Sequence, residues 1–253
     1  MREFVNNENK QLNIGLRTIL HIPIIVNYII QTNYSGDSVF IQEFKNVAKS
    51  YWKRGDTSKV DNSAFVKRFT EIYEDRCISN QDYYKVFINT FMDADPSLKD
   101  WFTGRVYIER NWPDGRDADT QAFIICEMDE NDEPVPTDMK AMLSNRFGWK
   151  QFKFFKDPLS EEIFDHNANH RSSIIKFPKV LVFSFVTGHN KLISKEIIFD
   201  DLTYTVMCAA TKDDIMYRVK DQWYKNLEKL PEYYQHEDNY TFVVYTPTRG
   251  ALS

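Results

Sequence analysis

Cysteine and histidine are among the residue types that could attack a carbonyl carbon or bind a metal ion. The three cysteines, Cys77, Cys126 and Cys208, lie far apart, and no CxxC pair is present to hold zinc. Cys126 and Cys208 fall in apolar stretches, a setting more typical of inert core thiols than of nucleophiles. No histidine is close in sequence to Cys77, so none of the three thiols has an evident base.

Two histidines, His166 and His170, have the i,i+4 spacing that could bind a metal ion from one face of a helix. Asn167 and Asn169 disfavour a helix at this point, and no third ligand is apparent. The pattern therefore favours a solvated loop, and the sequence predicts neither a metal site nor a cofactor.

The elements that must position any site are organised around the stretch 174–186, which predicts a strand. After Pro178 both alternating sets of side chains are large and apolar: Val180 and Val182 on one face, and Leu181, Phe183 and Phe185 on the other. A strand that is apolar on both faces needs cover on both, which predicts a place in the middle of a sheet. Proline lacks an N–H group and suits the first residue of such a strand.

The part of the chain before this strand has mostly helical periodicity. The stretch 12–30 predicts a glycine turn followed by an apolar helix that begins near Pro23, since proline suits the first turn of a helix. Three amphipathic helices are expected after it, around 40–51, 65–73 and 83–91. Ser79 followed three residues later by Asp82 is typical of a capped helix start.

Strand and turn patterns dominate from residue 105 onwards. Strands are predicted at 105–110, 122–128, 193–199, 203–210, 215–220 and 241–245. We expect the fold class to be α+β in one domain, 12–247, made of a helical lobe at 12–100 and a sheet-rich lobe at 101–247. Residues 1–11 are predicted to be a flexible lead-in, and 248–253 a tail.

Composition narrows the function classes. The net charge of −5 argues against a nucleic-acid backbone or an anionic membrane as the main partner. The apolar stretch 22–30 is far shorter than the ~20 residues of a membrane span, and no signal-peptide cleavage site follows it. With an odd number of dispersed cysteines, these features predict an intracellular protein rather than a secreted one.

Taken in order, these pieces resemble the ubiquitin-specific protease family. The segment from Asn13-Ile14-Gly15 to Thr18 resembles the family's Asn-x-Gly-Asn-Thr-Cys box, and the segment from Gln81-Asp82 to Phe87 resembles its Gln-Gln-Asp-x-x-Glu-Phe box. Further matches are Phe102-Thr103-Gly104, 177–185, 204–210, 217–220, Trp223-Tyr224 and 239–245. The resemblance spans roughly 12–245 and implies a papain-like cysteine-protease fold of the family's type.

The departures from the family's boxes bear on catalysis. A family member cuts with a cysteine thiolate, a histidine base and an Asp or Asn that orients the histidine. On the boxes, the cysteine position falls at Thr18 (or Ile19), the histidine position near Asp213-Asp214, and the orienting position near Asn226-Leu227. A threonine without a base is no substitute for a thiolate, and a carboxylate is a poor proton shuttle near neutral pH.

Two further departures agree with a lost activity. Pro23 delays the predicted helix and so moves its N-terminal dipole away from Thr18, where a thiolate would need stabilising. The zinc-binding cysteines that many family members carry are absent. We therefore predict no catalytic residues.

A binding role has its own candidate residues. The family's aspartate at the Asp82 position helps to hold ubiquitin's extended tail, so Gln81, Asp82, Tyr83 and Trp223 are candidates for a ubiquitin-tail or partner groove. Alternatively, Asp82 only closes a helix cap, an effect of about 1 kcal/mol, and Trp223 only packs in the core.

The sequence as a whole predicts a catalytically inactive, ubiquitin-protease-like domain that binds or scaffolds proteins in a larger assembly. Its high aromatic content suits an interface. Two alternatives stay open: a regulatory module that binds ubiquitin without cleaving it, and an active cysteine hydrolase with a rearranged triad.

Overall fold

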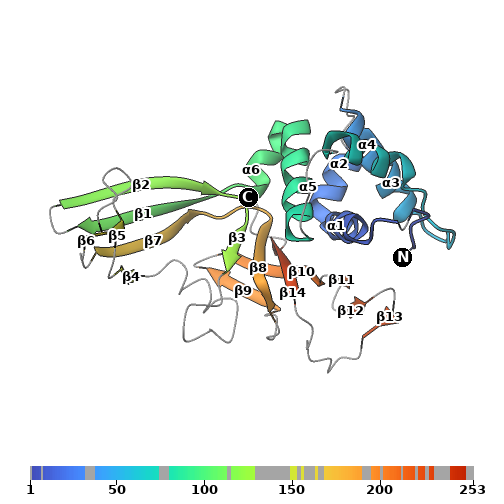
Figure 1. Cartoon of the computed structure of the whole chain (residues 1–253). Helices are drawn as coiled ribbons and strands as arrows, with labels where there is room; N and C mark the ends of the chain where they lie inside the picture. Colours follow the sequence, from blue (N-terminus) through green and yellow to red (C-terminus); the bar gives the residue numbers. More distant parts are fainter. Residues whose placement is uncertain are drawn as a thin grey trace.

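Helices occupy the N-terminal part of the computed structural model, and strands follow from Gly104 (Figure 1). The structure describes residues 2–6, 8–31, 38–73, 80–112, 115–128, 149–152, 155–156, 163–164, 168–189, 195–199, 202–211, 213–219, 222–225, 228–230 and 240–248. The helices are α1 (Lys10–Leu20), α2 (Pro23–Gln31), α3 (Val39–Tyr51), α4 (Ser63–Tyr73), α5 (Asn80–Ala94) and α6 (Lys99–Phe102), with a 3-10 turn at Pro96–Leu98. The three predicted amphipathic helices are confirmed as α3, α4 and α5.

The predicted start of a helix at Pro23 is correct for α2, but the glycine turn expected before it is wrong. Gly15 lies inside α1, which is a regular helix capped at Asn9. A Cβ atom at Gly15 would lie 2.8 Å from the Phe87 ring on α5. Glycine is therefore present because α1 and α5 approach closely, and not because the chain turns.

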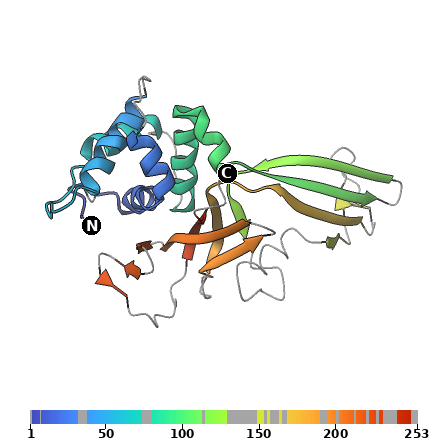
Figure 2. The ribbon, with the colours of Figure 1, turned by 180° about the vertical axis from the view of Figure 1, so that it is seen from behind.

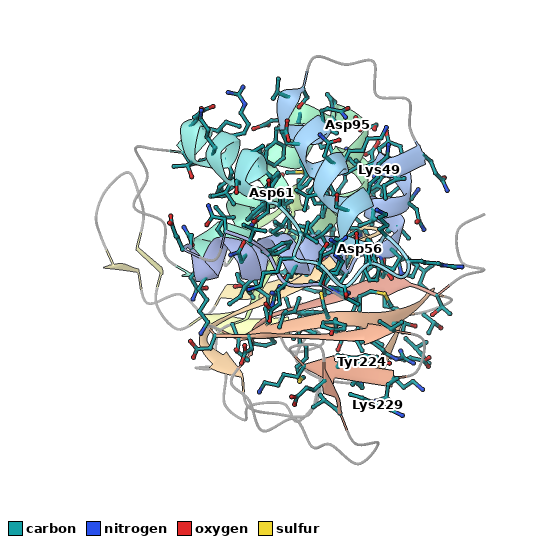
Figure 3. All side chains as sticks on the ribbon, turned by 90° about the vertical axis from the view of Figure 1, so that its right-hand side faces the viewer. Lys49, Asp56, Asp61, Asp95, Tyr224 and Lys229 are labelled. Carbon is teal, nitrogen blue, oxygen red and sulfur yellow. The ribbon has the colours of Figure 1, made fainter. Side chains whose placement is uncertain are left out.

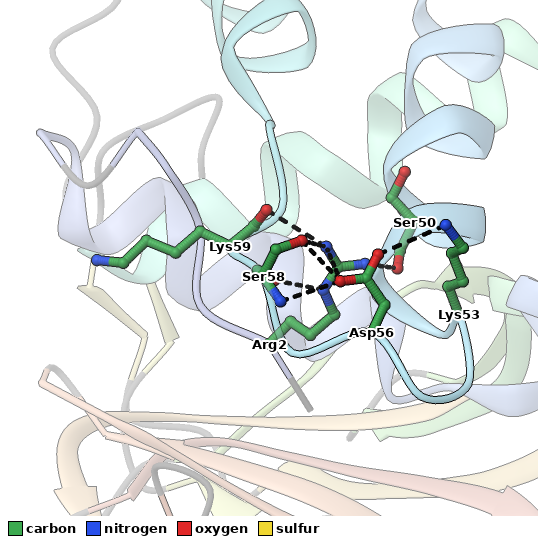
Figure 4. A network of polar contacts seen from close by, with 6 residues as sticks. All are labelled: Arg2, Ser50, Lys53, Asp56, Ser58 and Lys59. Atoms are coloured by element: carbon green, nitrogen blue, oxygen red, sulfur yellow. Dashed lines mark hydrogen bonds and ion pairs between the residues drawn. The ribbon is translucent and has the colours of Figure 1, made fainter.

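The flexible lead-in predicted at 1–11 is also wrong for the residues that the structure describes. Phe4 is fully buried and forms a parallel β-bridge with Val60. The Arg2 side chain is 6% exposed and donates to Ser50 O, Ser58 O and Ser58 Oγ, and it lies 3.3 Å from the Asp56 carboxylate (Figure 4). A buried guanidinium needs this many acceptors, so the segment is fixed to the helical lobe.

The larger sheet, called the main sheet, lies beneath the helices in Figures 1 and 3. Its order is β13-β12-β11-β10-β14-β8-β3, with β9 paired to β10. All described pairs are antiparallel except β3 with β8. The strands are β3 (Cys126–Met128), β8 (Leu181–His189), β9 (Glu196–Phe199), β10 (Leu202–Thr211), β11 (Ile215–Val219), β12 (Gln222–Lys225), β13 (Glu228–Lys229) and β14 (Tyr240–Pro247).

The prediction of a strand buried on both faces is confirmed by β8, which lies between β14 and β3. Val180 and Val182 belong to the core that the helices share with the sheet. Leu181, Phe183 and Phe185 belong to a second core on the opposite face. The main sheet is therefore covered on both sides, and the helices cover one of them.

A second, four-stranded sheet extends away from the helices and the main sheet (Figures 1 and 2), and we call it the projecting sheet. Its order is β2-β1-β7-β4, with β1 (Gly104–Trp112), β2 (Gly115–Phe123), β4 (Trp149–Phe152) and β7 (Ala168–Lys176). A separate pair joins β5 (Phe155–Lys156) to β6 (Ile163–Phe164). The predicted single strand 174–186 is therefore wrong in its first part, because 174–176 belongs to β7 of another sheet.

The described residues contain no single membrane-spanning helix and no cluster of metal ligands. Within the described residues, no single helix is long and apolar enough to cross a membrane; α1 and α2 pass only as a pair, bent by 80° at their break. In the same residues, no three His, Cys, Asp or Glu side chains are grouped as metal ligands.

Candidate functional site

The first turn of α1 faces the turn between β10 and β11 across a small cleft. The Asn9 side chain caps the helix by accepting a hydrogen bond from the Leu12 N–H at 3.0 Å. The cleft has a volume of about 270 Å³ and is lined by Lys10, Asn13, Ile14, Arg17, Asp213, Asp214 and Ile215. The cleft thus lies between the helical lobe and the main sheet, at the N-terminus of α1.

The β10–β11 turn holds its carboxylates toward the helix through a set of local hydrogen bonds. The Thr211 hydroxyl accepts from the N–H of Asp213 at 3.1 Å and of Asp214 at 2.9 Å, and the Thr211 N–H donates to Asp214 O at 2.8 Å. In this conformation Asp213 Oδ1 lies 3.0 Å from Lys10 Nζ. The two side chains are 56% and 61% exposed, so the ion pair spans the open mouth of the cleft.

Buried asparagines fix the floor of the cleft. Asn13 is 6% exposed and Asn62 is fully buried. Asn13 Nδ2 donates to Asn6 O at 2.8 Å, and Asn62 Nδ2 donates to Asn13 Oδ1 at 2.9 Å. Since buried amides need partners, this network ties α1 to the N-terminal segment and to the loop before α4.

Arg17 adds a second cation to the cleft wall. Its guanidinium lies over the Phe4 ring, 5.3 Å from the ring centre, which is a cation–π distance. Among the described residues, the cleft is lined by the basic side chains of Lys10 and Arg17 and the acidic side chains of Asp213 and Asp214. The described part of its lining includes no cysteine, histidine or serine.

Thr18, the position that the resemblance matches to the family's cysteine, lies at the other end of α1 from the cleft. Thr18 lies in the last turn of α1, is 1% exposed, and donates its hydroxyl proton to Ile14 O at 2.8 Å. A thiolate is stabilised at the start of a helix and not at its end. The helix start that faces Asp213-Asp214 holds Lys10, and Asn226-Leu227 lie outside the described residues.

His21 is the histidine whose surroundings the structure describes, and it is a core residue. It follows α1 as its C-cap, stacks on the Tyr217 ring at 4.0 Å, and places Nε2 3.1 Å from the Tyr51 hydroxyl. Burial and, to a lesser extent, the positive charge of Arg17 lower the pKa of His21 to about 3. The imidazole is therefore neutral at physiological pH and shielded from any substrate.

The described cysteines are buried as the sequence predicts. Burial raises the pKa of the Cys208 thiol well above its usual value, and its Sγ lies 3.8 Å from Thr18 O. Cys126 is 4% exposed in β3. Both thiols are in the state that disfavours nucleophilic attack. Cys77 and His166 lie outside the described residues.

The predicted groove residues are only partly described. Gln81, Asp82 and Tyr83 form the first turn of α5, but their side chains are outside the described part of the structure. Trp223 lies in β12 and packs against the core on the side of the main sheet that faces away from the helices. The next residue, Tyr224, lies on the helix side, where its ring stacks on Tyr217 at 5.7 Å. The groove itself stays a prediction.

Lys10 and Arg17 are the cleft residues that sequence reasoning missed. A signal for the helix start was present, because Asn9 is a good N-cap residue and apolar positions follow at helical spacing from Leu12. Gly15 concealed that signal, since a glycine near a predicted helix start suggests a turn.

Comparisons with known proteins give a match in structure alone. No protein-family profile matches the chain, and no curated protein sequence does. Among solved structures, the chain is similar to one in the SAGA Ubp8/Sgf11/Sus1/Sgf73 DUB module bound to ubiquitin aldehyde, with a TM-score of 0.72 and 11% identity over 98% of this chain and 70% of that one. The chain has the fold of a ubiquitin-specific-protease-type deubiquitinase.

Two further structures of that module agree. The yeast SAGA DUB module with a mutant Sgf73 gives a TM-score of 0.72 and 12% identity, covering 98% of this chain and 69% of the other. A module with a Ubp8 variant and a shortened Sgf11 gives 0.67 and 12%, covering 96% and 67%. The mixed architecture of helices and antiparallel sheet predicted from the sequence is thereby confirmed.

Proposed function

We propose that this chain is a degenerate, catalytically inactive member of the ubiquitin-specific protease family with a papain-like arrangement. Its role in this proposal is to bind or scaffold proteins within a larger assembly. The observation that carries the proposal is the cleft at the start of α1, where an ion pair of Lys10 and Asp213 lies between the helix and the β10–β11 turn.

The chemistry of that cleft supports inactivity. Acyl transfer by this kind of fold needs a thiolate and an imidazole in contact. An ammonium paired with a carboxylate offers neither a nucleophile for a carbonyl carbon nor a proton shuttle near neutral pH. The described side chains that have the right types, those of His21, Cys126 and Cys208, are all buried.

The proposed role in an assembly is supported by the complexes in which the similar chains were solved. Their chains were solved within multi-protein modules, one of them with ubiquitin aldehyde. We propose protein partners for this chain, ubiquitin among the candidates, in an intracellular setting. We propose no cofactor, nucleic acid or membrane as a partner.

Ubiquitin-based probes test the inactivity directly. The full chain is incubated with a ubiquitin vinyl-sulfone probe and, separately, with a fluorogenic ubiquitin C-terminal amide, beside an active deubiquitinase as positive control. We expect no covalent adduct and no fluorescence release. Selective labelling of one cysteine, located by mass spectrometry, would instead establish the active hydrolase with a rearranged triad, and a Cys77→Ser variant would show whether that thiol is responsible.

Binding of ubiquitin without cleavage is the second candidate, because one similar chain was solved in a module bound to ubiquitin aldehyde. Titration with free ubiquitin should then saturate at micromolar concentrations and weaken in Asp82→Ala. Asp93→Ala is the matched control, since this exposed aspartate lies near the other end of α5. Equal affinity of both variants would remove Asp82 from the binding site, whereas no saturation would remove this candidate and leave other protein partners.

A further inference from the structure

The outer strand of the projecting sheet, β2, is unusual among the sheet edges of this protein. It pairs with β1 over nine residues, from Gly104↔Phe123 to Trp112↔Gly115, and no described strand pairs with its other side. The other described edge strands are far shorter: β4 and β9 have four residues, β3 has three, and β5, β6 and β13 have two. Proteins usually keep edge strands short or covered, so a long open edge is a place where another chain can add.

The side chains of β2 leave this edge accessible. Every residue from 116 to 122 is exposed. In Figures 1 and 2 the strand forms the outer rim of the sheet that extends away from the helices. The exposed run includes two alanines, Ala118 and Ala122, which leave room for an approaching backbone.

One hydrogen bond shows which backbone groups of β2 point outward. The Thr120 N–H donates to the carboxylate of its neighbour Asp119 at 2.6 Å, so this N–H is directed away from β1. Backbone groups alternate in direction along an antiparallel strand. The N–H groups of Ala118 and Ala122 therefore also point to the open edge, and the Asp119 side chain covers only the one between them.

Charge on the edge distinguishes between partners. Asp117 and Asp119 are two residues apart and lie on the same face of β2. Antiparallel pairing with a second copy, centred on Ala118, would place Asp117 opposite Asp119 twice, and centring on either aspartate would place it opposite itself. Like charges in direct opposition destabilise a strand pair. These three registers are thus unfavourable for pairing with a second copy.

A basic partner strand would instead place opposite charges against these carboxylates. Asp117 contacts Arg110 at 3.5 Å, whereas Asp119 accepts only from Thr120 N and Gln121 Nε2 in the described structure. Cations at alternating positions of an added strand would face both carboxylates. The incoming carbonyl would take the Thr120 N–H, and the incoming cation would take the released Asp119 carboxylate.

We propose that the open edge of β2 binds an extended segment of a partner protein that carries lysine or arginine at alternating positions. This segment would add a fifth strand to the projecting sheet. The inference rests on the interaction role proposed above and names the partner chemistry for it. It does not involve the cleft, so probe labelling there and peptide binding here can fail independently.

The test uses the full chain and two labelled nonapeptides, one alternating lysine with threonine and the other glutamate with threonine, followed by fluorescence anisotropy. We expect the lysine peptide to bind at least about tenfold more tightly than the glutamate peptide, and less tightly as salt is added. Ala118→Pro should weaken it at least about tenfold, because proline removes an outward N–H group without breaking the β1–β2 ladder. Ala118→Ser, which keeps that N–H group, should bind like the wild type.

A second variant covers the case in which Ala118→Pro fails to fold, as judged by circular dichroism. Asp119→Lys keeps the backbone and should reverse the preference toward the glutamate peptide. Equal binding of both peptides, unchanged binding to Ala118→Pro, or no binding would each overturn the proposal. So would a wild-type dimer in sedimentation that Ala118→Pro converts to monomer, since the occupant would then be a second copy.

Discussion

The joint between the helices and the main sheet differs from the projecting sheet in what holds it together. At the joint, His21 from the end of α1 is enclosed by the rings of Tyr51, Trp52 and Tyr217, which come from α3 and β11. In the projecting sheet, β2 is exposed from 116 to 122, and its side chains make ion pairs that reach solvent, such as Arg116 with Glu109. Buried rings contribute several kcal/mol each, whereas exposed ion pairs contribute about 0–1 kcal/mol. The joint and the two cores therefore supply most of the stability, and the projecting sheet contributes mainly exposed surface.

The largest expected difference comes from truncating one aromatic ring in each region. Phe183 in β8 is fully buried and contacts the Tyr245 ring edge-on at 5.7 Å. Phe183→Ala should lower the free energy of unfolding by about 3–5 kcal/mol, because it removes apolar burial and leaves a cavity. Tyr107 in β1 is 36% exposed, and Tyr107→Ala should cost less than about 1 kcal/mol. Guanidinium denaturation followed by circular dichroism measures both; similar costs would contradict the division of roles.

The N-terminal segment belongs to the stable region, and Arg2 tests this. Arg2→Ala removes a buried guanidinium together with its part-buried hydrogen bonds to Ser58 and Lys59, so we expect a loss of about 1–3 kcal/mol in the free energy of unfolding. Lys59→Ala is the control, since its ion pair with Glu3 is exposed on both sides, and the effect should stay within about 0.5 kcal/mol. If both variants unfold at the same denaturant concentration, the segment is a loose lead-in after all.

The His21 cage predicts a pH dependence of stability. Burial lowers the folded-state pKa of His21 to about 3, below the 6.5 of an unperturbed histidine, so the unfolded chain takes up a proton first as the pH falls. The contribution of neutral His21 to the free energy of unfolding is fully present above pH 6.5 and is lost progressively as the pH falls below it. Between pH 7.5 and 5 the loss should be about 2 kcal/mol.

His21→Gln separates this effect from the other titrating groups. Glutamine keeps a polar nitrogen near Tyr51 but does not titrate, so its stability should change much less over the same pH range. The lowered pKa values of Asp56 and Asp61 act below this window and do not obscure it. Parallel stability curves for the wild type and the variant would show that the pKa of His21 is the same in the folded and unfolded states, and would contradict the prediction.

The sequence was a good guide to burial and a poor guide to how elements are shared between sheets. Alternating large side chains from Val180 to Phe185 located the central strand β8 and both of its cores, since alternation is a local property. The same reasoning extended the strand back to residue 174, although 174–176 pairs with β1 in the projecting sheet. Nothing local distinguishes one sheet from the other, because that choice depends on distant partners.

The cleft shows the same limit at the level of single residues. The resemblance placed the family's histidine position near Asp213-Asp214, and these residues lie in the β10–β11 turn that forms one wall of the cleft. It placed the cysteine position at Thr18 (or Ile19), which lies at the other end of α1, and Gly15 was interpreted as a turn before the helix. The actual reason for Gly15 is its contact with Phe87, a residue of a different helix, and no pattern within α1 reveals that contact.

The smallest expected effect concerns the ion pair across the cleft. Lys10 and Asp213 are more than half exposed, so a double-mutant cycle with Lys10→Met and Asp213→Asn should give a coupling of about 0.2–1 kcal/mol, decreasing with salt. A coupling that is larger and insensitive to salt would make this contact part of the stable joint. A small one means that the cleft can open to a partner at little cost to the fold. In that case the proposed lack of catalytic activity comes from the types of residue that line the cleft, and not from an ion pair that covers reactive groups.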